Sequence, residues 1–577
     1  MSDLSFGRHA AEVRAALDRL RAGRFIARLW DRDPSLWSAD PSVQAAIRNR
    51  LGWLRITDII SRRLDELVAL RRQMREAGFT HALLLGMGGS GLFTEVCRNV
   101  FGIAGDAIDL AVLDTTDATA IRLHQQRCAL QQLFVIVSSK SGSTSEISAL
   151  SKYFSGAFQS AGLSPADHAI AITDEGTPLA DQAAHGAFRR AFIHDQNTGA
   201  DVGGRFSALA YFGVVPAALM GVDVARLAQR VQEMFTRCGP QVPLEDNPAL
   251  QLGAMLGALA SAGREKMTLL CSPELASFGT WVEQLIAEST GKSGKGIAPF
   301  FGEPLDRAVR HPEDRVFIEL QLASHMDAAV DQRVRALIAE GHPVARIHWR
   351  DRYDLGGEVA KWAIATAVAG HLMELNPFDE PNVKESKDRT KALLDHYGRE
   401  KKFPAGAPLL CQDGNIAAYG KRPKTAEDGS LVALLGGLFR EWRPRDYVAV
   451  LSFLPRTDAL DRAAHALRQR LGEGLDCATA IGFGPRYLHS TGQLYKGGPD
   501  AAIFLLLTGE TADDLPIPGE PFSFNILKQA QALGDFEAMQ QRSRRVLHLH
   551  LRGGTLDHTV AHLLRAVDDA LATSPRR

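Results

Sequence analysis

The sequence predicts an α/β protein in which parallel sheets are covered by helices on both faces. The first observation is a set of short, continuous apolar runs, such as His81–Leu85 and Leu133–Val137, which are typical of strands buried on both faces. The second is that stretches with helical apolar spacing alternate with these runs. The third is the length of 577 residues, several times that of a usual single domain. Together they favour several α/β units.

The first two thirds of the chain predict a helical lead-in and two α/β domains. Residues 1–78 are rich in Ala, Leu, Arg and Glu and carry apolar residues at helical spacing, which predicts a helical segment. Domains are expected over residues 79–240 and 241–395. The predicted strands are His81–Leu85, Ile108–Leu113, Leu133–Val137 and Ala169–Ile172 in the first, and Met267–Cys271, Val316–Leu320 and Val344–His348 in the second. Helices are expected over 206–263 and near Glu358–Leu375.

The last third predicts a linker and a third α/β unit. Residues 396–440 contain several prolines and glycines and few long apolar runs, which is typical of a loop-rich connection. Over residues 441–577, apolar runs again alternate with helical stretches. The predicted strands are Tyr447–Leu454, Ala478–Phe483, Ala501–Leu507 and Val546–Leu551, and the predicted helices are 457–472, 524–543 and 555–572.

The charge balance and the cysteines exclude several classes of function. Lysine and arginine total 66 against 67 acidic residues, so no global field recruits nucleic acid or an anionic membrane. The six cysteines lie far apart without a CxxC pair, so we expect neither a metal site nor a disulfide framework. The N-terminus lacks a signal pattern, and no apolar run approaches the roughly 20 residues that cross a bilayer. We expect a cytoplasmic protein with no membrane or nucleic-acid partner.

Two Gly/Ser-rich turns, Gly86–Ser90 and Ser138–Ser145, are the strongest functional signal. Each lies where an apolar strand ends and a helix begins, where free backbone N–H groups and the helix dipole attract an anion. The second turn adds hydroxyls and the charge of Lys140, enough to hold a phosphate monoester without a metal. Neither turn ends in the Gly-Lys-Ser/Thr of a Walker loop, and the first fits GxGxxG poorly. Either turn alone also fits a plain strand–helix connection, but two on successive strands favour phosphate binding.

These turns resemble loops of the phosphoglucose isomerase family, which has the sugar isomerase (SIS) fold. Three further segments match that family in order: Asp201–Ser207 resembles its Gly-Gly-Arg-(Phe/Tyr)-Ser signature, Glu288–Lys292 its Glu-Ser-Asn-Gly-Lys segment, and Asn376–Lys387 its Asn-Pro-Phe-Asp-Gln…Lys element. Residues 482–498 resemble the isomerase half of proteins that fuse transaldolase to phosphoglucose isomerase. The resemblance implies two SIS domains with a C-terminal α/β extension.

The family's chemistry implies reversible isomerisation of glucose 6-phosphate and fructose 6-phosphate through ring opening and a cis-enediol, without metal or cofactor. Glu288 stands where the family carries its base, Arg205 suits stabilisation of the enediolate, and Lys387 matches the ring-opening lysine. The expected substrate contacts are Gly89 and Ser90 at the sugar end, and Ser139, Lys140, Ser141 and Thr144 at the phosphate.

Two positions depart from the family pattern. Pro312–Arg315 stand where the family has Asn-Gly-Gln-His, which leaves His489 and His311 as candidates for the ring-opening histidine. We favour His489 because glycines and polar residues surround it. Glu380 stands in a predicted substrate-binding position where the family has Gln, and an ionised glutamate only accepts hydrogen bonds and repels phosphate. We expect it to pair with Lys384 or Lys387 and to raise that lysine's pKa.

Alternatives to this activity stay open. Thr290, where the family has Asn, leaves room for an isomerase that also accepts mannose 6-phosphate. A non-catalytic sugar-phosphate sensor would be expected to lack Glu288, Arg205 and Lys387 together, and this chain has all three. The resemblance also implies a homodimer, because in the family a neighbouring subunit commonly donates the histidine.

Overall fold

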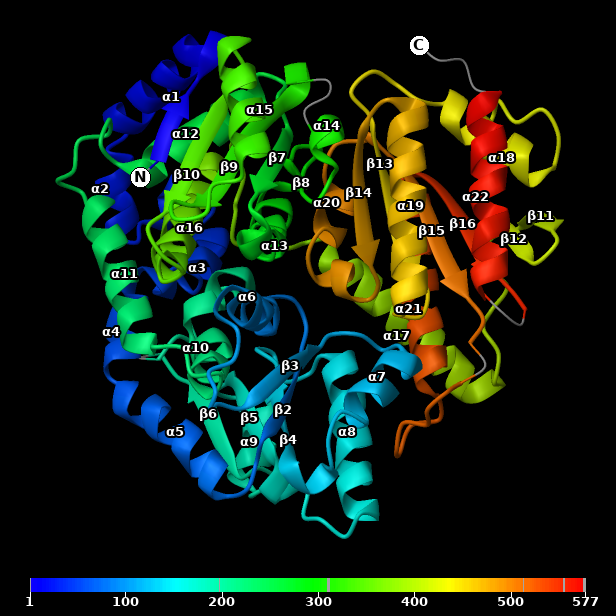
Figure 1. Cartoon of the computed structure of the whole chain (residues 1–577), viewed down its shortest axis with the longest axis horizontal. Helices are drawn as coiled ribbons and strands as arrows, with labels where there is room; N and C mark the ends of the chain where they lie inside the picture. The colour runs from blue at the N-terminus through cyan, green and yellow to red at the C-terminus, as the bar shows by residue number, and fades with distance from the viewer. Residues whose placement is uncertain (1, 197, 309–311, 512, 554–555, 574–577) are drawn as a thin grey trace.

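The computed structural model contains three sheets made mainly of parallel strands, each flanked by helices (Figure 1). It describes every residue except 1, 197, 309–311, 512, 554–555 and 574–577. None of the helices within this described part has the length and apolar character that crossing a membrane would need.

The first sheet is wholly parallel, with the strand order β3-β2-β4-β5-β6. Its strands are β2 (His81–Gly86), β3 (Asp109–Leu113), β4 (Leu133–Ser138), β5 (Ala169–Asp174) and β6 (Arg190–His194). Alternate side chains of β2 enter different cores: Leu84 packs in one, and Leu83 and Leu85 in another. Both faces of the sheet are therefore buried, which explains why these strands are continuous apolar runs. The helices of this region are α5 (Leu64–Glu76), α6 (Leu92–Phe101), α7 (Ala118–Gln125), α8 (Ser145–Ser160), α9 (Pro178–Ala184) and α10 (Tyr211–Leu219).

The second sheet has the order β1-β10-β9-β7-β8 and one antiparallel edge. Its strands are β1 (Ser2–Ser5), β7 (Lys266–Cys271), β8 (Ala298–Phe300), β9 (Arg315–Leu322) and β10 (Val344–Trp349). Strand β1 pairs antiparallel with β10, so the N-terminal segment is not wholly helical as predicted. The helices around this sheet are α11 (Val224–Arg237), α12 (Pro248–Ser261), α13 (Phe278–Thr290), α14 (Leu305–Ala308), α15 (Ala328–Ala339) and α16 (Asp354–Leu372). The lead-in helices are α1 (Ala10–Ala22), α2 (Phe25–Trp30), α3 (Pro41–Arg48) and α4 (Ile56–Ser61).

The third sheet has the order β11-β12-β16-β15-β13-β14 and combines four parallel strands with a hairpin. Its strands are β11 (Leu409–Asp413), β12 (Ile416–Gly420), β13 (Tyr447–Phe453), β14 (Ala478–Phe483), β15 (Ala502–Gly509) and β16 (Arg545–Leu551). The hairpin β11–β12 lies in the segment predicted to be a loop-rich linker. Gly414, with φ of +53°, and Asn415 form its two-residue turn. Helices α18 (Leu431–Arg440), α19 (Asp458–Leu475) and α22 (Leu556–Ala572) pack on one face.

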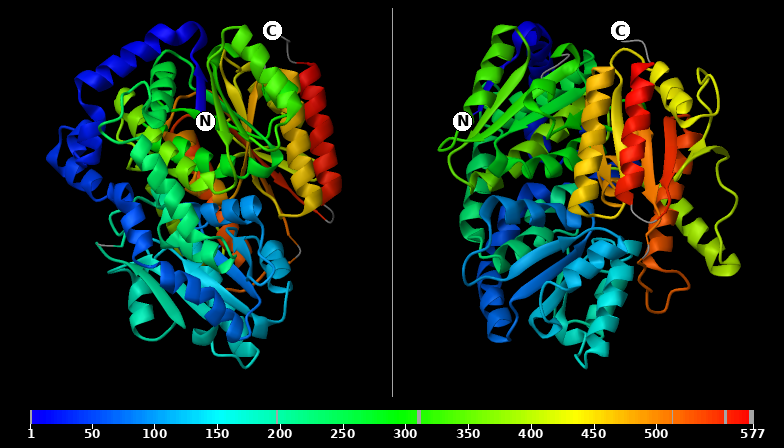
Figure 2. Two further views of the ribbon diagram at one scale, coloured as in Figure 1. Left: turned by 60° about the vertical axis from the view of Figure 1, so that its left-hand side comes forward. Right: turned by 45° about the vertical axis from the view of Figure 1, so that its right-hand side comes forward.

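The remaining helices join the third sheet to the rest of the molecule. They are α17 (Val383–Glu400), α20 (Gly492–Gly497) and α21 (Phe524–Gln541). Phe524 and Leu527 of α21 share a core with Phe154 and Phe158 of α8, so this helix packs against the first sheet's helices. Figures 1 and 2 show the third sheet and its helices lying against the other two parts of the molecule. The predicted limits of the domains stay a prediction.

Candidate active site

The two Gly/Ser turns lie side by side because β2 and β4 are neighbours in the first sheet. The first forms a short 3-10 helix, Gly88–Ser90, between β2 and α6, and the second connects β4 to α8. Ser138 ties them together by donating from Oγ to the carbonyl oxygen of Ser90 at 2.8 Å. The turns form part of the wall of a cavity of about 410 Å³.

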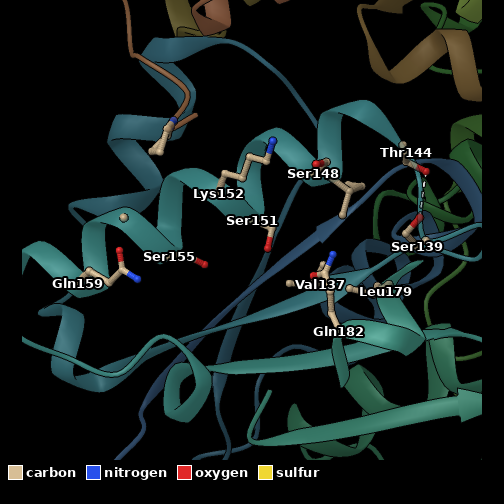
Figure 3. Close-up of a pocket in the computed structure, with 14 residues that line it drawn as sticks. Val137, Ser139, Thr144, Ser148, Ser151, Lys152, Ser155, Gln159, Leu179 and Gln182 are labelled. Atoms are coloured by element: carbon tan, nitrogen blue, oxygen red, sulfur yellow. Dashed lines mark hydrogen bonds between the residues drawn. The ribbon is translucent and has the colours of Figure 1, made fainter. Parts of the chain in front are cut away.

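Nearly all the predicted site residues line this cavity. They are Gly89, Ser90, Lys140, Ser141, Thr144, Arg205, Glu288, Glu380, Lys387 and His489. Ser139 instead lines a neighbouring cavity of about 300 Å³ along α8, and its Oγ lies 3.0 Å from Oγ1 of Thr144 (Figure 3). Thr144 lines both cavities, so Ser139 contacts a wall residue of the active cavity without lining that cavity itself. The alternative histidine, His311, lies outside the described residues.

Gly89 brings the first turn into direct contact with the segment that carries Arg205. A Cβ atom at position 89 would lie 2.0 Å from the carbonyl oxygen of Gly204, a separation that no real side chain tolerates. Only glycine therefore allows this approach of two backbones. The position of Arg205 thus depends on the first turn.

Arg205 is only 3% exposed and is fixed along the whole of its guanidinium. Its Nε donates to Oγ of Ser289 at 2.8 Å, and its Nη2 donates to the carbonyl oxygens of Pro377 and Asp379 at 2.7 and 2.9 Å. Its Nη1 faces two carboxylates, with Oε2 of Glu380 at 3.0 Å and Oε1 of Glu288 at 3.4 Å. Such a preorganised charge does not have to reorient when a negative oxygen develops nearby.

Glu288 lies near the end of α13 and is 8% exposed. Burial raises its pKa above the usual value, against the opposing charge of Arg205, and the negative charge of Glu380 raises it further. Nε2 of Gln284, one helical turn earlier, donates to Oε2 of Glu288 at 3.1 Å and to the carbonyl oxygen of His489 at 2.8 Å. A carboxylate with a raised pKa, held at a cavity wall, is suited to accept a proton from carbon.

The predicted pairing of Glu380 with Lys384 or Lys387 is wrong, because Glu380 pairs with Arg205 instead. Burial opposes its ionisation, but the charge and hydrogen bond of Arg205 keep its pKa below the usual value. Lys292 also holds the segment that precedes Glu380. Its Nζ donates to the carbonyl oxygen of Asn376 at 2.8 Å and to Oδ1 of Asp379 at 2.7 Å. Glu380 is therefore an ionised partner of the arginine.

His489 ends the 3-10 helix Arg486–His489 of the third unit, and its Nε2 lies 2.8 Å from Oε1 of Glu146. Burial would raise the pKa of Glu146, but the charge and hydrogen bond of His489 lower it to about 2. An ionised carboxylate only accepts, so Nε2 of His489 carries a hydrogen and Nδ1 is the nitrogen left for a ligand. Nε2 of Gln531, on α21, also donates to Oε1 of Glu146 at 2.7 Å.

Two further cationic side chains, Lys140 and Arg50, line the cavity. Nζ of Lys140 contacts the carboxylate of Asp174 and donates to the carbonyl oxygen of Ala200 at 3.2 Å. Burial lowers the pKa of Lys140, although Asp174 opposes the shift. Arg50 lines the same cavity and forms no ion pair with any described residue. In the described ranges, no group of three or more His, Cys, Asp or Glu side chains is arranged to hold a metal ion.

Comparison with known proteins decides the family. No protein-family model matches the chain. A glucose-6-phosphate isomerase of Citrifermentans bemidjiense is 34% identical over 359 residues, which are 56% of this chain and 67% of that relative. The chain belongs to the glucose-6-phosphate isomerase family. The predicted family is confirmed, and the chain is an isomerase.

Two further similarities agree with membership of the glucose-6-phosphate isomerase family. A probable glucose-6-phosphate isomerase of Haloarcula marismortui is 29% identical over 353 residues, covering 54% of this chain and 77% of the relative. The solved structure of a glucose-6-phosphate isomerase from Chlamydia trachomatis matches with a TM-score of 0.51 and 19% identity, over 65% of this chain and 78% of that chain. The latter shows the fold, and the predicted α/β class is confirmed.

Several residues that line the cavity or contact its wall residues had not been predicted from the sequence. Gln284 precedes Glu288 by four residues on α13, so helical spacing was the available signal. Glu146 lies in the first turn of α8, two residues after Thr144, and only its place beside the second Gly/Ser turn pointed to it. Arg50 and Gln531 reach the site from distant segments, and no motif marks either.

Proposed function

We propose that this chain interconverts glucose 6-phosphate and fructose 6-phosphate through ring opening and a cis-enediol. The observation that carries the proposal is the meeting, in one cavity, of a carboxylate with a raised pKa, a fixed guanidinium and an imidazole held by a second carboxylate: Glu288, Arg205 and His489. An aldose–ketose isomerisation needs a base, a stabiliser of negative oxygen and an acid for the ring oxygen.

Glu288 is the proposed base. It takes the proton from C2 of the open-chain aldose, the C2 electron pair forms the double bond of the enediolate, and the carbonyl oxygen at C1 becomes negative. A proton then passes from the C2 hydroxyl to the oxygen on C1, the same carboxyl protonates C1, and the C2–oxygen bond becomes the ketone carbonyl. Because burial already raises the pKa of Glu288, the carboxyl can accept and return a proton near neutral pH.

Arg205 stabilises the enediolate oxygens in this proposal. Its charge is fixed by the bonds to Ser289, Pro377 and Asp379, so its orientation costs little in the transition state. The guanidinium also stays protonated throughout, which keeps it from competing with Glu288 for the substrate proton.

His489 and Lys387 are the proposed ring-opening pair. Glu146 holds the imidazole by Nε2 and directs Nδ1 to the substrate, so the proton of the ring opening moves through Nδ1. Lys387, an exposed residue of α17 at the cavity wall, supplies the second group. The third unit is thus proposed to take part in catalysis through His489.

The phosphate is proposed to bind at the second turn. Ser141 and Thr144 offer hydroxyls, α8 begins at the next residue, and Lys140 supplies a charge. Arg50, which forms no salt bridge with any described residue, adds a second cation. Ser139 acts through its contact with Thr144.

Two finer points stay predictions. A cytoplasmic location and a homodimer follow from the sequence pattern and the resemblance. The described residues supply Glu288, Arg205, Lys387 and His489 from one chain, so the proposed steps do not require a second copy. No observation favours mannose 6-phosphate or a non-catalytic role over the proposed reaction.

A coupled assay of the purified chain tests the proposal. Fructose 6-phosphate and mannose 6-phosphate are offered separately, with a chelator present, to the wild type and to Glu288→Gln. We expect turnover of fructose 6-phosphate and a loss of about 10²- to 10⁴-fold in kcat on removal of the base. Unchanged kcat in Glu288→Gln would contradict the assignment.

Glu283 offers a matched control on the same helix. It is half-buried and lies outside the cavity wall, and burial raises its pKa to about 8. Near pH 7 its carboxyl is mainly uncharged, so Glu283→Gln should fold and turn over substrate like the wild type. An equal loss in Glu283→Gln and Glu288→Gln would show damage to α13 instead of loss of the base.

A further inference from the structure

A second cavity of about 230 Å³ lies outside the proposed active site and shares none of its wall residues. It is formed between the third sheet, α17, α21 and the segment that follows α17. Its wall includes three aromatic side chains, Phe403, Tyr419 and Phe536. Because a cavity of about 150 Å³ already admits benzene, this one has room for one or two fused rings.

The walls suit a flat, uncharged occupant. The ring of Tyr419 stacks on His548 with a centroid distance of 5.5 Å and an interplanar angle of 29°, which fixes one wall. The ring of Phe536 contacts the same imidazole, with a centroid distance of 5.3 Å and an interplanar angle of 56°. Glu537 is the one wall residue that is an acid or a strong base, so a sugar phosphate finds no cation there. Aromatic rings pack on such walls by offset or edge contacts.

The polar floor of this cavity consists of Thr508, His548 and His550. Oγ1 of Thr508 lies 2.7 Å from Nε2 of His548 and 2.8 Å from Nδ1 of His550. A hydroxyl has one hydrogen, so Thr508 donates to one ring and accepts from the other. Burial lowers the pKa of His548 to about 3, with His550 contributing, and burial also lowers the pKa of His550. Both rings are therefore neutral near pH 7.

Neutrality of both rings fixes what the floor offers to a ligand. The ring that accepts from Thr508 carries its hydrogen on the outer nitrogen, and the ring that donates has a bare outer nitrogen. One outer nitrogen is thus a donor and the other an acceptor, whichever way Thr508 points. Oε1 of Glu510 lies 4.0 Å from Nε2 of His550 and favours the hydrogen there. Nδ1 of His548, a side chain only 5% exposed and with no partner for this atom among the described residues, is then the acceptor.

We propose that this cavity binds a neutral, planar heteroaromatic compound of one or two fused rings that carries a ring N–H. The N–H donates to Nδ1 of His548, and the rings fill the space between Phe403, Tyr419 and Phe536. The occupant also contacts α21, the helix that carries Gln531, so it touches the element that supports Glu146 and His489. The site does not depend on the proposed isomerase reaction.

Titration of the full-length protein with indole, by calorimetry at pH 7.5, tests the inference. Benzofuran has nearly the same shape but no N–H, and we expect it to bind about three- to tenfold more weakly, the effect of one hydrogen bond. Thr508→Val should abolish the preference for indole over benzofuran. Without the hydroxyl, nothing determines which nitrogen of His548 and of His550 carries the hydrogen. No saturable indole binding to the wild type, or equal affinity for the two compounds, would overturn the proposal.

Two tryptophan variants of α21 locate the probe. Leu533 is half-buried in the cavity wall, so Leu533→Trp fills the space and should abolish indole binding. Gln541 is exposed at the end of the same helix and outside the wall, so Gln541→Trp should bind indole like the wild type. Circular dichroism of both variants checks that they fold. Indole binding that survives in folded Leu533→Trp would place the probe elsewhere and overturn the inference.

Discussion

Two buried carboxylates of the active cavity region, Glu288 and Glu146, have pKa values shifted in opposite directions. Both residues are buried. Burial raises the pKa of Glu288, whereas the pKa of Glu146 falls to about 2. Oε1 of Glu146 contacts His489 and Gln531, and Ser145 donates to its Oε2 at 2.9 Å. Glu288 receives one hydrogen bond, from Gln284, and shares Arg205 with Glu380.

The difference teaches that charged and hydrogen-bonding partners, and not burial alone, divide the work between the two carboxylates. A group whose charged form is fully hydrogen-bonded stays ionised and positions its partner. A group that is buried with few donors keeps its affinity for a proton and can act as a base. We therefore expect Glu146 to orient His489 and Glu288 to transfer protons.

Among the variants that leave Glu288 itself in place, the largest effect is expected for Glu146→Gln. The amide keeps the size of the side chain but loses the charge that fixes Nε2–H of His489, so the imidazole turns away from the ring oxygen. We expect kcat for a ring-closed substrate to fall about 10- to 100-fold, with KM nearly unchanged. A steady-state assay checks both values. A rise in KM alone would assign Glu146 to substrate binding.

A smaller effect is expected from Gly89→Ala, which disturbs the Glu288 side through Arg205. The added Cβ would lie 2.0 Å from the carbonyl oxygen of Gly204, so one backbone must shift. We expect a loss of about 1–3 kcal/mol in the free energy of unfolding, measured by denaturant titration, together with reduced kcat. At Gly105 nothing lies within 4 Å of an added Cβ, so Gly105→Ala should change stability by less than about 0.5 kcal/mol. Equal losses in both variants would refute the packing argument.

The smallest effect is expected from Glu380→Gln. The negative charge of Glu380 contributes to the raised pKa of Glu288, so removing it lowers that pKa. The base then stays ionised to lower pH, and the acid limb of the kcat/KM profile moves to lower pH. A profile measured from pH 5 to 8 on both proteins shows the shift. Movement of the acid limb to higher pH would contradict the shared role of Arg205.

The sequence predicted the strands that are continuous apolar runs and missed the short or partly polar ones, which are β1, β6, β8, β11 and β12. Runs such as those of β2 and β4 are continuous because two cores cover them. Strand β6 is only partly buried and carries Arg190 and His194 at its ends, so it lacks an apolar run. The hairpin β11–β12 carried a signal in its Gly414-Asn415 turn, which the surrounding prolines and glycines obscured.

The candidate site shows the same division. Residues within continuous motifs, such as Arg205 and Glu288, could be named from the sequence because the few residues around each match a signature of the family. The position of Gln531 could not, since it lies 385 residues from Glu146 and reaches it only through the packing of α21 on the first unit. The pairing of Glu380 with Arg205 likewise depends on how two distant loops meet.

Deuterium incorporation from D₂O into an open-chain aldose phosphate that cannot close a ring tests the division of labour most directly. The substrate needs no ring opening, so exchange at C2 reports the base alone. Glu146→Gln should exchange at nearly the wild-type rate, while Glu288→Gln should be slower by about 10²- to 10⁴-fold. Equal slowing of the two variants, or the reverse order, would contradict the assignment of Glu288 as the base.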